Sequence, residues 1–147
     1  MKIVVTGATG FVGKALVVDL LANSFEIKAL VRQSSVALPL AVEQVVVGDL
    51  SELALGDSSG FLREAFIGVD VVVHTAARVH VMNDDASDPL NEFRKVNCDA
   101  TLILARLAAE SGVKRFVFLS SIKVGGETSE IGHPLNEKIN HIPTQTN

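Results

Sequence analysis

The sequence predicts an α/β domain with a doubly wound parallel sheet, and three observations support this fold class. Five short runs rich in Val, Ile or Phe alternate with stretches of helical spacing, as in folds built from β-α units. Several of the runs are continuously apolar, which is typical of strands covered on both faces. A glycine-rich segment directly follows the first run and precedes the first helical stretch.

The predicted strands share an enrichment in β-branched residues. In order, they are Lys2–Thr6, Glu26–Val31, Gln44–Val47, Val69–Val73 and Lys114–Leu119. Right-handed crossovers between successive units give a sheet of about five strands in the order 3-2-1-4-5. The last strand in this order has an open edge, which allows self-association into a homo-oligomer.

Helical spacing marks the segments between the strands. Phe11–Ala22 and Phe61–Phe66 are predicted helices, and Gly68 is placed to end the second of them. A longer helix is expected from Asp88-Pro89 to Ser111-Gly112, because proline suits the first helical turn. Residues 1–121 should form the domain, whereas 122–147 is polar and aperiodic and is expected to be a loop-like tail open to disorder.

Composition narrows the classes of function. The chain has 147 residues, 48% of them hydrophobic and 20% charged, which suits a single globular domain. A net charge of −4 offers no basic surface for nucleic acid or membrane, and charges interrupt every long apolar stretch. Cys98 is the single cysteine, which excludes an intramolecular disulfide and favours a reducing, cytoplasmic location. No histidine spacing typical of a metal site occurs, so no metal is expected.

The segment TGATGFVG, residues 6–13, lies between the first predicted strand and the first predicted helix. A dinucleotide pyrophosphate needs a tight turn, close backbone approach and N–H groups at a helix N-terminus. Gly7 would form the turn, Gly10 would let a phosphate approach, and Gly13 would let the helix pack against the strand. The segment therefore predicts a Rossmann-type dinucleotide site, with a glycine turn that binds nothing as the alternative.

A P-loop is the competing interpretation of the same glycines, because Gly13-Lys14 is present. That motif requires a glycine and a Ser or Thr at the positions where this sequence has Ala8 and Ala15. Ala15 has no hydroxyl for magnesium, so we reject the P-loop.

Five segments together resemble the N-terminal part of the extended short-chain dehydrogenase/reductase family, and more narrowly its NAD-dependent nucleotide-sugar epimerase/dehydratase group. They follow the family's order as TGATGFVG at 6–13, GDL at 48–50, HTAA at 74–77, VNCDAT at 96–101 and FVFLSSIKVGG at 116–126. The resemblance implies a Rossmann-type sheet that is incomplete relative to the full family domain. It also implies a dinucleotide cofactor and, in the full-length protein, a nucleotide-diphosphate sugar as substrate.

The expected cofactor-binding residues lie in these segments and at the end of the second strand. They are Gly7, Thr9, Gly10, Phe11, Val12, Gly13, Arg32, Asp49, Leu50, Thr75, Ala76, Ala77 and Asn97. By resemblance, Asp49 accepts from the adenine amino group, with capping of the next turn as the alternative. Asn97 resembles an asparagine that braces the backbone near the nicotinamide, and a solvated helical residue is its alternative.

Ser121 aligns with the family's catalytic serine, which binds the reacting sugar oxygen. The family also uses a Tyr-x-x-x-Lys pair for hydride chemistry, and this chain has no tyrosine. We therefore expect the N-terminal part of a longer enzyme that is inactive alone, with a non-catalytic dinucleotide-binding module or redox sensor as the alternative. Ile122-Lys123 replace the Asp-Glu of 4,6-dehydratases, which favours a 4-epimerase or a reductase over a dehydratase.

The type of cofactor remains open between NAD and NADP. NAD-binding sheets place an acid at the end of the second strand, whereas this strand ends at Arg32. A guanidinium can bind a 2′-phosphate, so Arg32 favours NADP, while the family's epimerases use NAD. Arg32 stacking on the adenine or pointing into water is the alternative.

Overall fold

The sheet of this protein is parallel throughout and has five strands in the order β3-β2-β1-β4-β5, as predicted. The structure, a computed structural model, describes residues 1–53, 59–79, 88–125, 128–129, 131–134 and 136. The strands are β1 (Lys2–Thr6), β2 (Glu26–Val31), β3 (Glu43–Val46), β4 (Val71–His74) and β5 (Arg115–Phe118).

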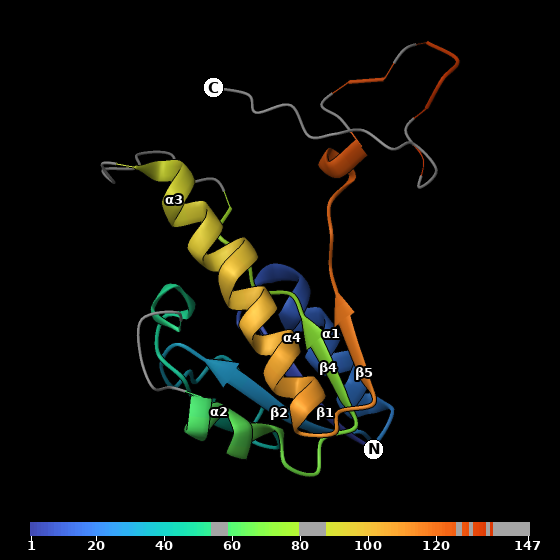
Figure 1. The fold of residues 1–147 in the computed structure, drawn as a ribbon. Coiled ribbons are helices and arrows are strands. Elements are labelled where there is room, and N and C mark those ends of the chain that lie inside the picture. Colours follow the sequence, from blue (N-terminus) through green and yellow to red (C-terminus); the bar gives the residue numbers. More distant parts are fainter. Residues whose placement is uncertain (54–58, 80–87, 126–127, 130, 135, 137–147) are drawn as a thin grey trace.

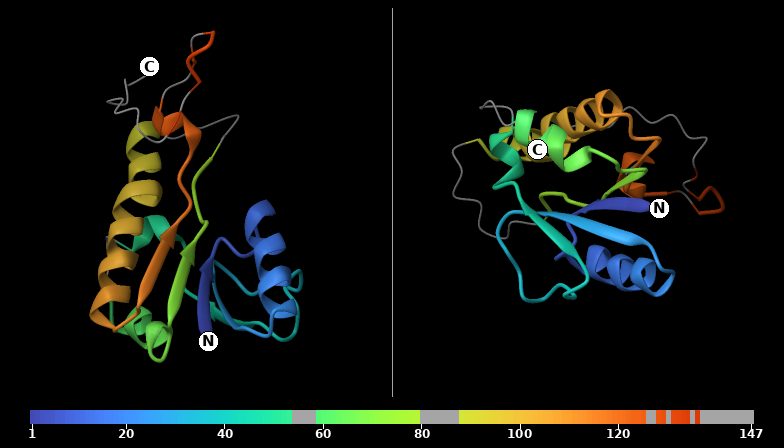
Figure 2. Two further views of the ribbon diagram at one scale, coloured as in Figure 1. Left: turned by 90° about the vertical axis from the view of Figure 1, so that its right-hand side faces the viewer. Right: turned by 90° about the horizontal axis from the view of Figure 1, so that it is seen from below.

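Helices cover both faces of the sheet in a three-layer arrangement (Figures 1 and 2). Helix α1 (Phe11–Ala22) lies on one face, and α2 (Ser59–Phe66) and α4 (Thr101–Glu110) lie on the other. One core cluster between the sheet and α1 contains Ile3, Val5 and Val17. A second, which joins the opposite face to α2 and α4, contains Val4, Phe66 and Leu104. Successive residues of β1 thus enter different cores, which explains the continuous apolar pattern.

Three strands differ slightly from their predicted bounds. The predicted fourth strand begins at Val69, whereas β4 begins at Val71, because the Val69 N–H still donates to Phe66 O in the turn after α2. β3 is shifted by one residue toward Glu43, and β5 is one residue shorter at each end than predicted. Val69 is nevertheless buried, so hydrophobicity marked the core position correctly and the hydrogen-bond pattern set the boundary.

The long predicted helix contains a π-helical segment. It begins as expected at Asp88, whose Oδ1 accepts from Asn91 N at 3.1 Å, and α3 spans Pro89–Arg94. A π-helical segment, η2 (Lys95–Ala100), then joins α3 to α4. The expected helix from Asp88-Pro89 to Ser111-Gly112 is therefore present, and the π-helical segment within it was not predicted from the sequence. π-Helical turns inside α-helices occur frequently at functional sites, and Asn97 lies within this one.

The predicted tail begins with a short 3-10 turn, η3 (Ile122–Gly125). Most of 122–147 lies outside the described residues, so its loop-like character stays a prediction. Within the described ranges, no helix is long and apolar enough to cross a membrane.

Candidate functional site

An open cleft of about 990 Å³ lies at the carboxyl edge of the sheet, where open α/β sheets bind ligands. The glycine-rich turn, the ends of β2 to β5 and the π-helical segment contribute to its walls. Every residue that the sequence analysis assigned to the cofactor or to catalysis lines this cleft, Ser121 included. Their juxtaposition is a finding, whereas their contacts with a ligand stay predictions.

The glycine-rich turn brings backbone very close to backbone. Gly7 has a φ of +70°, and a Cβ added to it would lie 2.6 Å from the Ala76 nitrogen. A Cβ at Gly13 would collide with the carbonyl oxygen of Gly7. Gly13 therefore lets α1 approach the turn itself, rather than the strand as we expected. The turn is closed by Gly10 N–H, which donates to Gly7 O at 2.9 Å.

The N-terminus of α1 opens toward the cleft. Its N-cap residue is Gly10, so no side chain caps the first helical N–H groups. Such an end attracts anions through its N–H groups and the helix dipole. Phe11 is 95% exposed beside it and Val12 is half-exposed, an unusual position for two apolar side chains unless a ligand or another part of a protein covers them.

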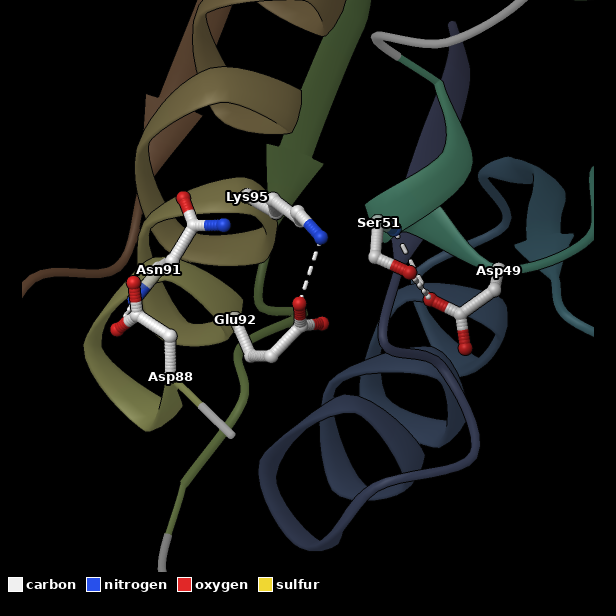
Figure 3. A network of polar contacts seen from close by, with 6 residues as sticks. All are labelled: Asp49, Ser51, Asp88, Asn91, Glu92 and Lys95. Atoms are coloured by element: carbon white, nitrogen blue, oxygen red, sulfur yellow. Dashed lines mark hydrogen bonds and ion pairs between the residues drawn. The ribbon is translucent and has the colours of Figure 1, made fainter. Parts of the chain in front are cut away.

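Asp49 and Arg32, which follow the ends of β3 and β2, form a pair at the lining of the cleft. Asp49 Oδ1 accepts from Ser51 N at 2.9 Å and from Ser51 Oγ at 2.8 Å, which starts the 3-10 turn η1 (Leu50–Glu52), as Figure 3 shows. These hydrogen bonds, followed by the attraction of Arg32, hold the pKa of Asp49 below its usual value. Asp49 thus caps the following turn, as in the alternative interpretation. Its second carboxylate oxygen, Oδ2, also accepts from Arg32 at 3.3 Å.

The loop after β4 carries Thr75, Ala76 and Ala77 along the cleft. Thr75 donates to Thr6 O through its N–H at 3.2 Å and through its hydroxyl at 2.7 Å. The Ala76 N–H donates to Thr6 Oγ1 at 3.3 Å. These bonds fix the backbone of the loop against β1 and leave small side chains at the surface of the cleft.

Asn97 braces the same loop from the π-helical segment. Its Oδ1 accepts from Arg78 N at 2.7 Å, and its Nδ2 donates to Arg78 O at 3.0 Å. The amide group therefore satisfies both backbone groups of Arg78, as a neighbouring strand would. Asn97 is thus not the solvated residue of the alternative interpretation. The predicted position near the nicotinamide stays a prediction. Lys95, two residues before Asn97, pairs with Glu92 (Figure 3).

Several residues that bear on the site were not singled out from the sequence. Arg78, Val79 and Phe118 line the cleft, and His74 is buried directly beneath the loop. Burial lowers the pKa of His74. The sequence search considered His74 only as a metal ligand, although its position at the end of an apolar strand was a usable signal. Among the described residues, no group of three or more His, Cys, Asp or Glu side chains could hold a metal ion.

Comparison with known proteins agrees with this geometry. The model of the NAD dependent epimerase/dehydratase family matches residues 3–147. This chain belongs to that family. A UDP-glucose 4-epimerase of Vibrio cholerae is 41% identical over 145 residues, which cover 97% of the chain and 41% of that protein. A dihydroflavonol 4-reductase of Hordeum vulgare is 38% identical over 130 residues, which cover 81% of the chain and 34% of the reductase.

The fold has close structural relatives as well. A UDP-glucose 4-epimerase of Thermus thermophilus, solved in complex with NAD, superposes with a TM-score of 0.78 at 28% identity, and the match covers 97% of this chain and 45% of the epimerase. The predicted Rossmann-type fold and the predicted family are therefore confirmed. The chain spans less than half the length of each of these relatives.

Proposed function

We propose that this chain is the dinucleotide-binding part of a cytoplasmic nucleotide-sugar 4-epimerase and that its cleft holds NAD. The observation that carries the proposal is the glycine-rich turn, in which Gly7 admits backbone where a side chain would clash and α1 presents an uncapped N-terminus. The family is described as NAD dependent, and the Thermus relative was solved with NAD. On this basis we assign dinucleotide binding to residues 1–121.

The residues would divide the work along the cleft. The α1 N-terminus would hold the diphosphate, because helix N-terminal N–H groups bind anions. Asp49 and Arg32 would border the adenosine end, and the 75–78 loop would support the ribose and nicotinamide end. Ser121, just before η3, would donate to or accept from the reacting sugar oxygen and so fix its orientation.

Bound NAD would supply a reversible hydride acceptor for C4 of the sugar. The proton that leaves the C4 hydroxyl must be taken by a positioned base. The chain has no tyrosine, so the phenol used for this step in the family cannot come from its 147 residues. Accordingly, we assign it binding and orientation rather than the complete reaction.

A reductase is the second candidate, because the Hordeum reductase also matches this chain, at 38% identity over 81% of its length. The two functions share the dinucleotide site and differ in whether hydride returns to the same molecule. An assay of a longer protein that contains this chain would distinguish the two functions. An epimerase interconverts C4 epimers without net consumption of NADH, whereas a reductase consumes one equivalent per turnover.

Isothermal titration of the purified chain with NAD tests the binding proposal directly. We expect saturable binding with one site per chain. Gly7→Val should abolish it, because a branched side chain cannot occupy the space against Ala76 at a φ of +70°. Gly68→Val, at the same φ of +70° but with open space around it, is the matched control for backbone strain and should still bind. Absence of NAD binding by a folded wild-type chain would refute the proposal.

A further inference from the structure

His74 connects three elements beneath the cleft without lining it. The residue ends β4 and is only 1% exposed, and both ring nitrogens have a hydroxyl partner. Nδ1 lies 2.7 Å from Thr6 Oγ1 at the end of β1, and Nε2 lies 2.9 Å from Thr101 Oγ1 at the start of α4. A buried imidazole held on both sides by residues distant in sequence is a constrained group.

The neighbouring hydrogen bonds determine which nitrogen carries the proton. Thr6 Oγ1 already accepts from Ala76 N–H, so its own proton can point at His74 Nδ1. The Thr101 hydroxyl donates to Asn97 O at 3.2 Å, so Thr101 Oγ1 can accept from His74 Nε2–H. With the neutral Nε2–H tautomer, both ring nitrogens and both hydroxyl groups have a hydrogen-bond partner. With a proton on Nδ1 instead, the Thr6 hydroxyl would lack an acceptor among the described residues.

The hydrogen-bonded series Thr6–His74–Thr101 reaches both ends of the cleft loop, residues 75–78. At one end, Thr6 Oγ1 accepts from the Ala76 N–H. At the other, the Thr101 hydroxyl donates to the Asn97 carbonyl, and the Asn97 side chain is hydrogen-bonded to the backbone of Arg78. We propose that His74, as a neutral Nε2–H imidazole, is a positioning residue that fixes the 75–78 loop for the cofactor through Thr6 on one side and Thr101 and Asn97 on the other. The inference rests on the proposed function only in naming the cofactor as the ligand of that loop.

The surroundings of the ring favour the neutral state. The side-chain contacts shown for the ring come from Thr6 on β1, Thr101 on α4, and Phe116 and Phe118 on β5, with ring centroids 5.8 and 5.9 Å away. None of these groups is titratable, and burial alone shifts the pKa of His74 downward. A charged imidazole would present an N–H to each hydroxyl. The Thr6 proton would then have to turn away from the ring, and the hydrogen bond from Thr6 to Nδ1 would be lost.

Nuclear magnetic resonance of the ¹⁵N-histidine-labelled chain at pH 7 gives a direct test without any ligand. Long-range ¹H–¹⁵N correlations distinguish a protonated ring nitrogen from an unprotonated one. We expect Nε2 protonated and Nδ1 unprotonated for His74. A Nδ1–H tautomer or a doubly protonated ring would overturn the inference.

Variants at Thr101 test the positioning role. Thr101→Val keeps the shape but removes the hydroxyl, and it should speed amide exchange of Arg78 and raise the Kd for NAD by about three- to tenfold, the effect of one hydrogen bond. Thr101→Ser restores a hydroxyl and should restore both values to within about twofold. Ile103→Val, which thins core packing in the same helix, is the control for general destabilisation and should change neither.

The outcomes separate the two proposals. If Thr101→Val leaves exchange at Arg78 unchanged, or if Ile103→Val accelerates it equally, His74 is not a positioning residue. If wild-type chain fails to bind NAD, the proposed function fails, and the tautomer and the exchange data alone decide on His74. If NAD binds but its Kd is the same in wild type and Thr101→Val, the loop does not position the cofactor and the inference is overturned.

Discussion

Arg32 Nη1 lies 3.3 Å from Asp49 Oδ2, so the base at the end of β2 and the acid after β3 form an ion pair at the lining of the cleft. Both groups are accessible, with 77% and 38% of their side chains exposed. The pair changes the expectation drawn from Arg32 alone. A 2′-phosphate would have to replace a carboxylate that already holds the guanidinium and that repels the phosphate.

We therefore predict that the wild-type chain binds NAD more tightly than NADP. Asp49→Asn should reduce the difference in affinity between NAD and NADP. It removes the repulsion between the carboxylate and the 2′-phosphate, and it leaves Arg32 able to bind that phosphate. Arg32→Ala should weaken NADP selectively, by up to about tenfold for one exposed charged hydrogen bond. Parallel titrations of both cofactors against the three proteins check this. Equal weakening of both cofactors by Arg32→Ala, or none, would contradict the assigned role.

Gly13 offers a test of the close approach between α1 and the turn. Gly13→Ala should destabilise the fold by about 1–3 kcal/mol, because its Cβ would collide with the Gly7 carbonyl and helix and turn must separate. Gly60→Ala, in α2 and without any atom within 4 Å of the added Cβ, is the matched control. It should be neutral or stabilise by up to about 1 kcal/mol. Urea unfolding measures both, and a destabilisation of equal size in the two variants would refute the steric explanation.

The fold could be predicted from the sequence because its signals are local. Continuous apolar runs mark strands covered on both faces, and the glycines at 7, 10 and 13 mark a turn in which backbone contacts backbone. The same locality explains why the candidate residues were found in one cleft. Parallel strands end at the same edge, so residues that follow successive strands meet there.

The missed features depend on contacts between distant residues. The π-helical segment contains Asn97, which is hydrogen-bonded to Arg78, and the Thr101 hydroxyl donates to the Asn97 carbonyl. No helical period reveals those bonds. The roles of His74 and Thr6 likewise require knowing that β1, β4 and α4 converge. The pairing of Arg32 with Asp49 joins residues 17 apart whose proximity follows only from the packing of β2 beside β3.

Acid stability should depend on Glu43 at the opposite edge of the sheet. Its carboxylate lies 3.1 Å from Lys28, whose side chain is 8% exposed, and 3.2 Å from Lys2. Burial opposes its ionisation, but the hydrogen bonds from the two lysines outweigh this and hold the pKa of Glu43 below its ordinary value. A lowered folded pKa stabilises the protein above the unfolded pKa, and this contribution is lost as pH falls through the folded value.

Glu43→Gln should accordingly lower the free energy of unfolding at pH 7 by up to about 1 kcal/mol, since about half of the Glu43 side chain is exposed to solvent. The difference from wild type should vanish at acidic pH, where Glu43 is protonated. Urea titrations at pH 7 and at successively more acidic pH values measure it. Glu26→Gln, at an exposed position of the neighbouring strand, should have no comparable effect. A difference that persists unchanged in acid would exclude the ion pair as its source.

The isolated chain should show no turnover of a nucleotide sugar. A positioned general acid or base contributes roughly 10²–10⁴ in rate, and the chain has no phenol to act as one. Chromatographic analysis of UDP-glucose and UDP-galactose after incubation with the chain and NAD checks this. The preparation should first be shown to bind NAD, so that absence of turnover is not absence of folding. Reproducible epimerisation, or net reduction of NAD with a sugar present, would contradict the assignment of binding alone.

The edge of the sheet at β5 predicts self-association. Strand β5 pairs with β4 on one side only in the described sheet, and Val117 and Phe118 are 37% and 50% exposed. Unpaired strand edges with apolar side chains bind other chains. We expect sedimentation velocity to show concentration-dependent oligomers. Val117→Lys should suppress them, because natural edge strands use lysine to prevent pairing. Val36→Lys adds the same charge at an exposed site outside the sheet, so an equal effect of both variants would indicate charge repulsion rather than pairing at β5.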